Sequence, residues 1–196
     1  MRSQQTSTMS SARSISSDGS GESVAPGAWA TIVADYRRHG SSVLNGAFVS
    51  LCVFRFGRWG RNRRNPLARI LASKAYGFAN LFVANLTKIW IPPSVTIGRD
   101  IHIVNNEGSL SIHPDTVIGD RLGVMHNITI GTNMRGGAPV IGDDVFIGVN
   151  STILGAIRIG NRVRIAANTA VTTDVPDDHI AVGSPARIFR RLGPFQ

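Results

Sequence analysis

The 196-residue chain contains a single cysteine, Cys52. One cysteine cannot form a disulfide within the chain, and it cannot supply a cysteine-rich zinc site. Histidine, cysteine and carboxylate residues do not cluster at ligand spacing in the sequence, so no metal site is expected. No segment reaches the roughly 18 uncharged apolar residues that a membrane-spanning helix needs.

Acidic residues are scarce in the first half of the chain. Residues 1–90 hold 12 lysines and arginines against 3 acids, whereas residues 91–196 hold 9 of each, so the net charge of +9 belongs to the first half. That half lacks interleaved aromatic residues and any recognisable nucleic-acid-binding motif. A nucleic-acid partner is therefore not expected.

Composition changes twice along the chain. Residues 1–27 are rich in serine and glycine without an apolar run, which predicts a disordered tail and excludes a secretory signal. A transit peptide remains an alternative for this segment. We expect four parts, namely the tail at 1–27, a helical region at 28–93, a β-helix at 94–186 and a C-terminal tail at 187–196.

The helical region is expected from apolar spacings of three and four residues in Ala28–Tyr36 and Leu44–Phe56. Pro66 suits the first turn of a third helix, and a further apolar stretch covers Phe78–Trp90. One interpretation is packing on the next domain or on another subunit. The other is a peripheral membrane contact, with arginines 55–64 facing anionic lipid.

The second half shows a different period. Every sixth residue is aliphatic in two series: Ile112, Ile118, Val124, Ile130, and then Ile141, Ile147, Ile153, Ile159, Ile165, Val171. A step of six places these side chains on one face of an extended chain but fits no helical turn. Short strands separated by sharp bends, stacked into a parallel β-solenoid, are predicted. The frame breaks twice, with nine residues from Ile103 to Ile112 and eleven from Ile130 to Ile141.

Three segments carry a family resemblance: Met125–Thr132, Ile153–Gly160 and Val182–Ile188. They resemble the hexapeptide-repeat acyltransferases, and in particular the serine O-acetyltransferases. More weakly, Asp35–Arg38 and Phe54–Trp59 resemble the exopolysaccharide, colanic-acid-type enzymes of that group. The resemblance implies a mainly β fold, a left-handed parallel β-helix, and a homotrimer with sites between subunits.

Acetyl-CoA is the co-substrate that the resemblance implies. Small residues such as Gly131 and Gly148 would let the extended pantetheine arm lie along the solenoid backbone. The family motif also places Thr132, Ala166 and Arg187 at the cofactor, where the arginine would pair with a phosphate.

The chain departs from the family at the general base. The family carries histidine where this sequence has Asn105 or Asn106, and asparagine cannot accept a proton near neutral pH. His126, which lies just before the Gly131–Thr132 turn and is expected beside the 133–140 loop, is one candidate base.

The other candidates are His113 and Glu107, with Asn106 as an oxyanion donor. His39 and His179 are expected to be surface residues.

Three functions remain open from the sequence. The first is acetylation of a sugar hydroxyl in exopolysaccharide or surface-polysaccharide biosynthesis, and the second is serine O-acetylation. The third is a non-catalytic trimeric solenoid that has lost the base. The acceptor is accordingly a small molecule or a glycan. The expected location is cytoplasmic, with the inner face of the membrane as an alternative.

Overall fold

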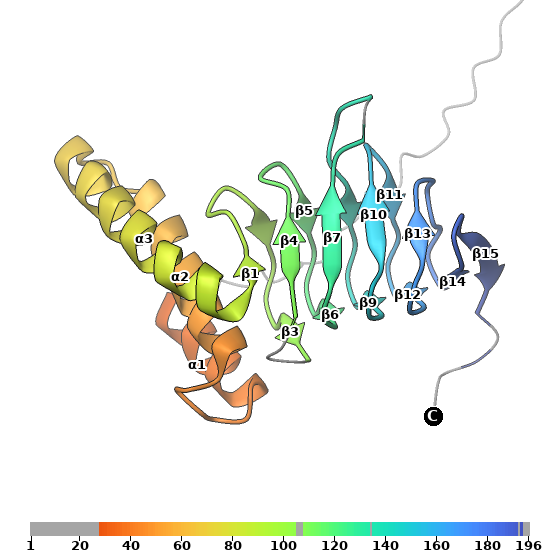
Figure 1. The fold of residues 1–196 in the computed structure, drawn as a ribbon, viewed down its shortest axis with the longest axis horizontal. Coiled ribbons are helices and arrows are strands. Elements are labelled where there is room, and N and C mark those ends of the chain that lie inside the picture. The colour runs from red at the N-terminus through yellow and green to blue at the C-terminus, as the bar shows by residue number, and fades with distance from the viewer. Residues whose placement is uncertain (1–27, 105–107, 134, 192, 194–196) are drawn as a thin grey trace, which may run out of the picture.

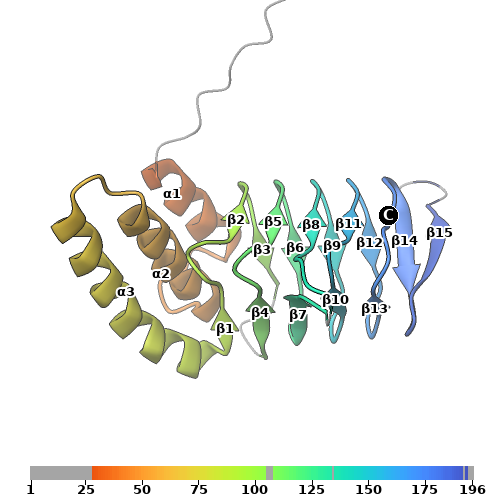
Figure 2. The ribbon, with the colours of Figure 1, turned by 90° about the horizontal axis from the view of Figure 1, so that it is seen from above.

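Three helices cap one end of a β-solenoid in the computed structural model, which describes residues 28–104, 108–133, 135–191 and 193 (Figure 1). The helices are α1 (Ala28–Arg38), α2 (Gly46–Arg61) and α3 (Pro66–Thr87). The C-terminal strands lie at the opposite end of the solenoid (Figure 2). No helix in these described ranges is both long and apolar enough to cross a membrane.

Asparagine side chains begin two of the helices. Asn45 accepts a hydrogen bond from the N–H of Phe48 at the start of α2, and Asn65 accepts from Leu67 and Ala68 at the start of α3. The two apolar segments that the sequence placed after Pro66 form one helix. That helix ends at Lys88, which adopts a left-handed conformation with φ of 60°.

Fifteen short strands, counted over the described residues, build the solenoid. They are β1 (Ile89–Trp90), β2 (Thr96–Ile97), β3 (His102–Ile103), β4 (Leu110–Ile112), β5 (Val117–Ile118), β6 (Gly123–Val124), β7 (Ile128–Gly131), β8 (Val140–Ile141), β9 (Phe146–Ile147), β10 (Thr152–Leu154), β11 (Arg158–Ile159), β12 (Arg164–Ile165), β13 (Ala170–Val171), β14 (His179–Val182) and β15 (Arg187–Arg190). Sheet A has the order β1-β4-β7-β10-β13, sheet B β11-β8-β5-β2, and sheet C β15-β14-β12-β9-β6-β3. All pairs are parallel except β14–β15.

The six-residue frame predicted the register. Ile153 pairs with Val171 on one side and with Ile130 on the other. Regular coils repeat every 18 residues, as between Ile141 and Ile159. The first frame break lengthens one coil to 21 residues, between Ile97 and Ile118, and the second lengthens another to 23, between Ile118 and Ile141. The extra residues of each break therefore stay outside the ladder, and the aliphatic residues before and after each break still pair with one another.

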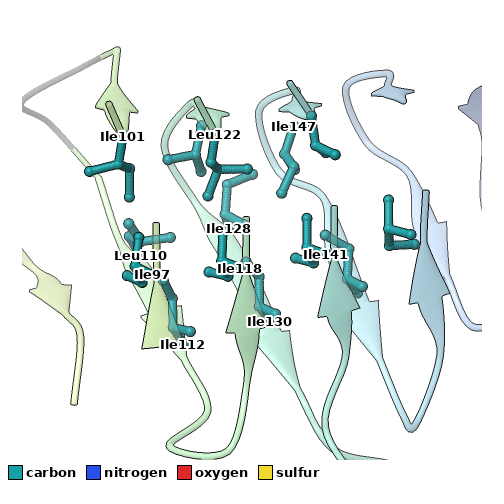
Figure 3. Close-up of a cluster of buried hydrophobic side chains, with 14 of the residues drawn as sticks. Ile97, Ile101, Leu110, Ile112, Ile118, Leu122, Ile128, Ile130, Ile141 and Ile147 are labelled. Carbon is teal, nitrogen blue, oxygen red and sulfur yellow. The ribbon is translucent and has the colours of Figure 1, made fainter. Parts of the chain in front are cut away.

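The solenoid interior is a stack of these aliphatic side chains (Figure 3). Ile112, Ile147 and Ile153 have no exposed surface, and the buried cluster continues into Leu51 and Phe54 of α2. The helical region and the first coil thus share one core, so the helices are an integral cap of the solenoid.

Both ends of the predicted β-helix need correction. Ile89 is buried and pairs with Leu110, so sheet A begins inside the segment assigned to helices. The left-handed cap at Lys88 turns the chain directly into this strand. At the other end, Arg187–Arg190 forms β15 rather than a tail, because it pairs with the edge that β14 would otherwise leave open.

Paired charges line the corner between sheets B and C. The guanidinium of Arg121 binds Asp144 at 2.6 Å, and that of Arg162 binds Asp178 at 2.7 Å. These arginines hold the pKa values of both carboxyl groups below their usual range, since they donate side-chain hydrogen bonds to the ionised form.

Candidate active site

The corner between sheets C and A carries His126, so we call it the CA corner. His126 is half-buried and lies between β6 and β7. Its carbonyl oxygen accepts a hydrogen bond from the N–H of Asn150 at 3.2 Å. Asn127 follows His126, and Asn150 and Asn168 hold the same position in the next two coils. Their side-chain amides form a ladder, in which Asn127 donates to Asn150 at 3.0 Å and Asn150 donates to Asn168 at 3.2 Å. This ladder fixes the backbone from which His126 projects.

Gly108 lies directly against His126. Its φ is +87°, and a Cβ placed there would come within 2.8 Å of the Cβ of His126. Only glycine can occupy this position, because any side chain would collide with His126. Gly108, which follows the extra residues of the first frame break, therefore contacts the histidine directly. Asn106 and Glu107 precede this glycine but lie outside the described residues.

Gly148 and Ala166 continue the CA corner beyond Met125. Backbone N–H groups link this column from coil to coil: Met125 donates to Ile147, Gly148 to Ile165, and Ala166 to Ala181. A Cβ on Gly148 would lie 2.6 Å from the amide nitrogen of Ala167. The floor of the column is therefore backbone and methyl groups, over which an extended ligand arm can lie.

Arg187 stands at the far end of the same column. The N–H of Ala166 donates to the carbonyl of Ala181, and the next residue, Val182, pairs with Arg187 across β14 and β15. Four strand spacings of about 4.8 Å separate the Met125 position from Arg187, roughly 19 Å in all. The structure thus brings Gly148, Ala166 and Arg187 onto one line that starts at Met125, the residue before His126, and ends at an exposed cation.

Buried hydroxyl groups support this column from inside. The Ser151 Oγ donates to the carbonyl of Ala166 at 2.9 Å, and the N–H of Gly183 donates to Thr169 Oγ1 at 3.2 Å. Both hydroxyl residues are at most 2% exposed. Ser151 and Thr169 occupy interior positions that are aliphatic in other coils, so hydrogen bonds as well as packing hold the backbone of the CA corner in place.

The opposite corner, between sheets A and B, holds the remaining predicted residues, and we call it the AB corner. Gly131 ends β7 there and Thr132 follows it. His113 lies beside them, because its N–H donates to the carbonyl of Ile130 at 2.8 Å. The 133–140 loop also leaves from this corner. Asn133 lies against Gly155, where a Cβ would come within 2.4 Å of its amide.

The sequence interpretation placed the loop beside His126, and within one chain this is wrong. Strand β7 lies between them, and its residues separate His126 from Gly131 by roughly 15 Å. The predicted cofactor residues therefore divide into Gly148, Ala166 and Arg187 at the CA corner and Gly131 with Thr132 at the AB corner.

His39 corrects a second expectation, because it is only 5% exposed. Its Nδ1 lies 2.7 Å from the carbonyl of Asp35, and its Nε2 accepts from the N–H of Ile103 at 3.2 Å. It therefore ties the end of α1 to β3. His102 lies beside it, with ring centroids 5.6 Å apart, and burial lowers the pKa of His102. These two histidines join the helices to the first coil of the solenoid at β3.

Comparisons with known proteins agree with this architecture. Residues 138–173 match the family model described as bacterial transferase hexapeptide (six repeats). A serine acetyltransferase of Mycobacterium tuberculosis is 35% identical over 130 residues, which cover 65% of this chain and 55% of that protein. The chain thus spans little more than half the length of this relative.

Two further relatives are matched over more of their length. A serine acetyltransferase of Synechococcus elongatus is 30% identical over 83% of this chain and 69% of that protein. Soybean serine acetyltransferase, solved in complex with serine, superposes with a TM-score of 0.66 at 30% identity, covering 83% of this chain and 69% of the other. The chain belongs to the serine acetyltransferase family of hexapeptide-repeat transferases.

Proposed function

We propose that the protein is an acetyl-CoA-dependent O-acetyltransferase whose acceptor is serine. The observation that carries the proposal is the column at the CA corner, which runs from His126 over Gly148 and Ala166 to Arg187. Relatives named serine acetyltransferases support serine as the acceptor, whereas no feature of the described residues favours a sugar. Serine, the second interpretation from the sequence, thus replaces the sugar as the leading one.

Acetyl-CoA lies along the column in this proposal. Its phosphates pair with Arg187, and the pantetheine arm passes over Ala166 and Gly148 and bonds to backbone groups. This direction places the thioester near His126. In this arrangement the acetyl carbon lies beside His126, a half-buried side chain next to the column, and this supports His126 as the base.

The reaction needs a base for the serine hydroxyl proton. His126 accepts this proton while the hydroxyl oxygen bonds to the acetyl carbon, and the carbon–sulfur bond then breaks. The departing thiolate takes the proton from the imidazolium, so the enzyme returns to its starting state. An imidazole can both accept and return a proton, which suits both transfers.

His113 is a weaker base on geometric grounds. Its Nδ1 accepts a hydrogen bond from the N–H of Asp115 at 3.3 Å. While Nδ1 accepts this bond, the ring hydrogen lies on Nε2, which then donates rather than accepts. His113 is thus suited to donate to an oxyanion rather than to take up the hydroxyl proton.

A homotrimer would unite the two corners. Gly131, Thr132 and the 133–140 loop lie too far from His126 within one chain, so we propose that a neighbouring subunit presents its AB corner to the CA corner. Sedimentation velocity at micromolar concentration tests this assembly. A trimer is expected, and a monomer with full activity would remove the shared site.

The acceptor is tested by measuring thiol release from acetyl-CoA with serine, with a panel of sugars and oligosaccharides, and without acceptor. Serine-dependent release, with acetylserine identified by mass spectrometry, is expected. Release that depends on a sugar but not on serine would assign the acceptor to the glycan class. Binding of acetyl-CoA without release to any acceptor would favour the non-catalytic solenoid, the alternative suggested by Asn105 and Asn106 at the family's histidine position.

A further inference from the structure

Helix α3 leaves its large apolar side chains in solvent. Ala72 is its one buried residue among the described side chains. Seven large apolar residues of this helix are between 55% and 87% exposed: Leu67, Ile70, Leu71, Phe78, Leu81, Phe82 and Leu86. An exposed apolar set of this size on one element marks an interaction surface.

These residues share one face of the helix, which we call the outer face. They recur at spacings of three and four residues, the spacing of a helical stripe. The opposite face packs on α2 through small residues. A Cβ on Gly57 would lie 2.5 Å from the ring of Tyr76, and one on Gly60 would lie 2.6 Å from the Cβ of Ala72.

This close packing between α2 and α3 has a consequence for the outer face. Because the helices touch directly at Gly57 and Gly60, α3 cannot turn its leucines and phenylalanines toward α2 at these contacts. Figure 2 shows α3 on the far side of α2 from α1, at the margin of the molecule. The outer face is therefore available to a partner.

The charge around the outer face has one sign. Residues 36–99 contain eleven lysines and arginines and no aspartate or glutamate. Three of these cations, Arg61, Arg69 and Lys74, line a groove of about 520 Å³ between α2 and α3, next to Ile70 of the outer face. Apolar and cationic groups thus stand side by side, which complements a surface that is apolar beneath a layer of anions.

Two other occupants fit less well. A second copy of the chain would bring two cationic regions together without an acid to pair them, which is unfavourable. Residues 1–27 contain one isoleucine, one valine and no leucine, phenylalanine or tryptophan, so they offer little apolar surface to cover the face.

We propose that the outer face of α3 docks on an anionic lipid bilayer. The helix lies parallel to the surface, with Leu71, Phe78 and Phe82 inserted among the acyl chains. Lipid phosphates bind in the groove at Arg61, Arg69 and Lys74. The proposal concerns the position of the protein in the cell and does not depend on the acceptor of the acetyl group.

Vesicle co-sedimentation of the full-length protein tests this docking. Vesicles of phosphatidylcholine alone are compared with vesicles of equal parts phosphatidylcholine and phosphatidylglycerol. We expect the wild type to partition at least tenfold more strongly onto the anionic vesicles, and added salt to weaken the binding because the phosphate contacts are ionic. Equal binding to both vesicles, or binding to neither, would overturn the proposal.

Matched variants locate the contact. Phe78→Glu should weaken binding to anionic vesicles at least tenfold, and Lys74→Glu should reduce the preference for them. Phe189→Glu is the control, because Phe189 is 54% exposed on β15 at the opposite end of the solenoid. Circular dichroism verifies that each variant is folded. If Phe78→Glu dissociates an oligomer but sediments with vesicles as the wild type does, the partner is a second copy and the lipid proposal is wrong.

Discussion

Replacing Ile153 by alanine tests the aliphatic ladder on which the whole account depends. The side chain has no exposed surface and lies between Ile130 and Val171 in sheet A. The substitution removes three carbon atoms, worth about 2.4 kcal/mol at ~0.8 kcal/mol each. The cavity left between rigid neighbouring coils raises the loss to about 3–4 kcal/mol.

Thermal unfolding followed by circular dichroism measures this loss. For a chain of this size we expect Ile153→Ala to lower Tm by about 6–16 °C. Thr152→Ala is the matched control, because Thr152 precedes Ile153 in the same strand but points outward, and it should cost less than about 1 kcal/mol. If Ile153→Ala is as stable as Thr152→Ala, the six-residue frame does not define the core.

Three further predictions concern the helical junction, the cofactor and the charged corner. His39→Ala should destabilise the fold by about 1–3 kcal/mol in urea unfolding, because it removes the acceptor of a buried N–H on β3, and an unchanged midpoint would contradict this role. Arg187→Ala should weaken acetyl-CoA binding about three- to tenfold in calorimetry, whereas the control Arg158→Ala should bind it as the wild type does. Equal affinities of Arg187→Ala and the wild type would show that Arg187 does not contact a phosphate. The pKa values of Asp144 and Asp178 are lowered in the folded state, so their ion pairs stabilise the fold above the unfolded-state pKa of about 3.9. This stabilisation is lost as the pH falls below that value, and Tm should drop with it. A constant Tm would show that the pairs contribute nothing.

The solenoid could be predicted from the sequence because its repeat is local. The step of six places Ile153 and Val171 in adjacent coils without knowledge of any other part of the chain. The two frame breaks were also visible, since the steps from Ile103 and from Ile130 are not multiples of six. The start of sheet A was missed because β1 is only two residues long and follows an apolar helix directly.

The stacking of Gly148, Ala166 and Arg187 could be predicted for the same reason, because the coil repeat aligns the motif positions that they hold. Their role at the cofactor stays a prediction. The separation of His126 from the loop at 133–140 was missed, because the two are close in sequence. It becomes visible only when each residue is assigned to a corner of the solenoid, which needs the sheet order. The burial of His39 depends on how α1 docks against β3, and no periodicity encodes that contact.

The rate of acetyl transfer by His126→Ala tests the central claim, which is catalysis at the CA corner. Formation of acetylserine from acetyl-CoA and serine is measured for the wild type, His126→Ala and His113→Ala, with acetyl-CoA binding measured in parallel. We expect His126→Ala to lower kcat by on the order of 10²–10⁴ while acetyl-CoA binds nearly as before. Full turnover by His126→Ala would contradict the account and move the base elsewhere, with Glu107→Gln as the next variant to measure.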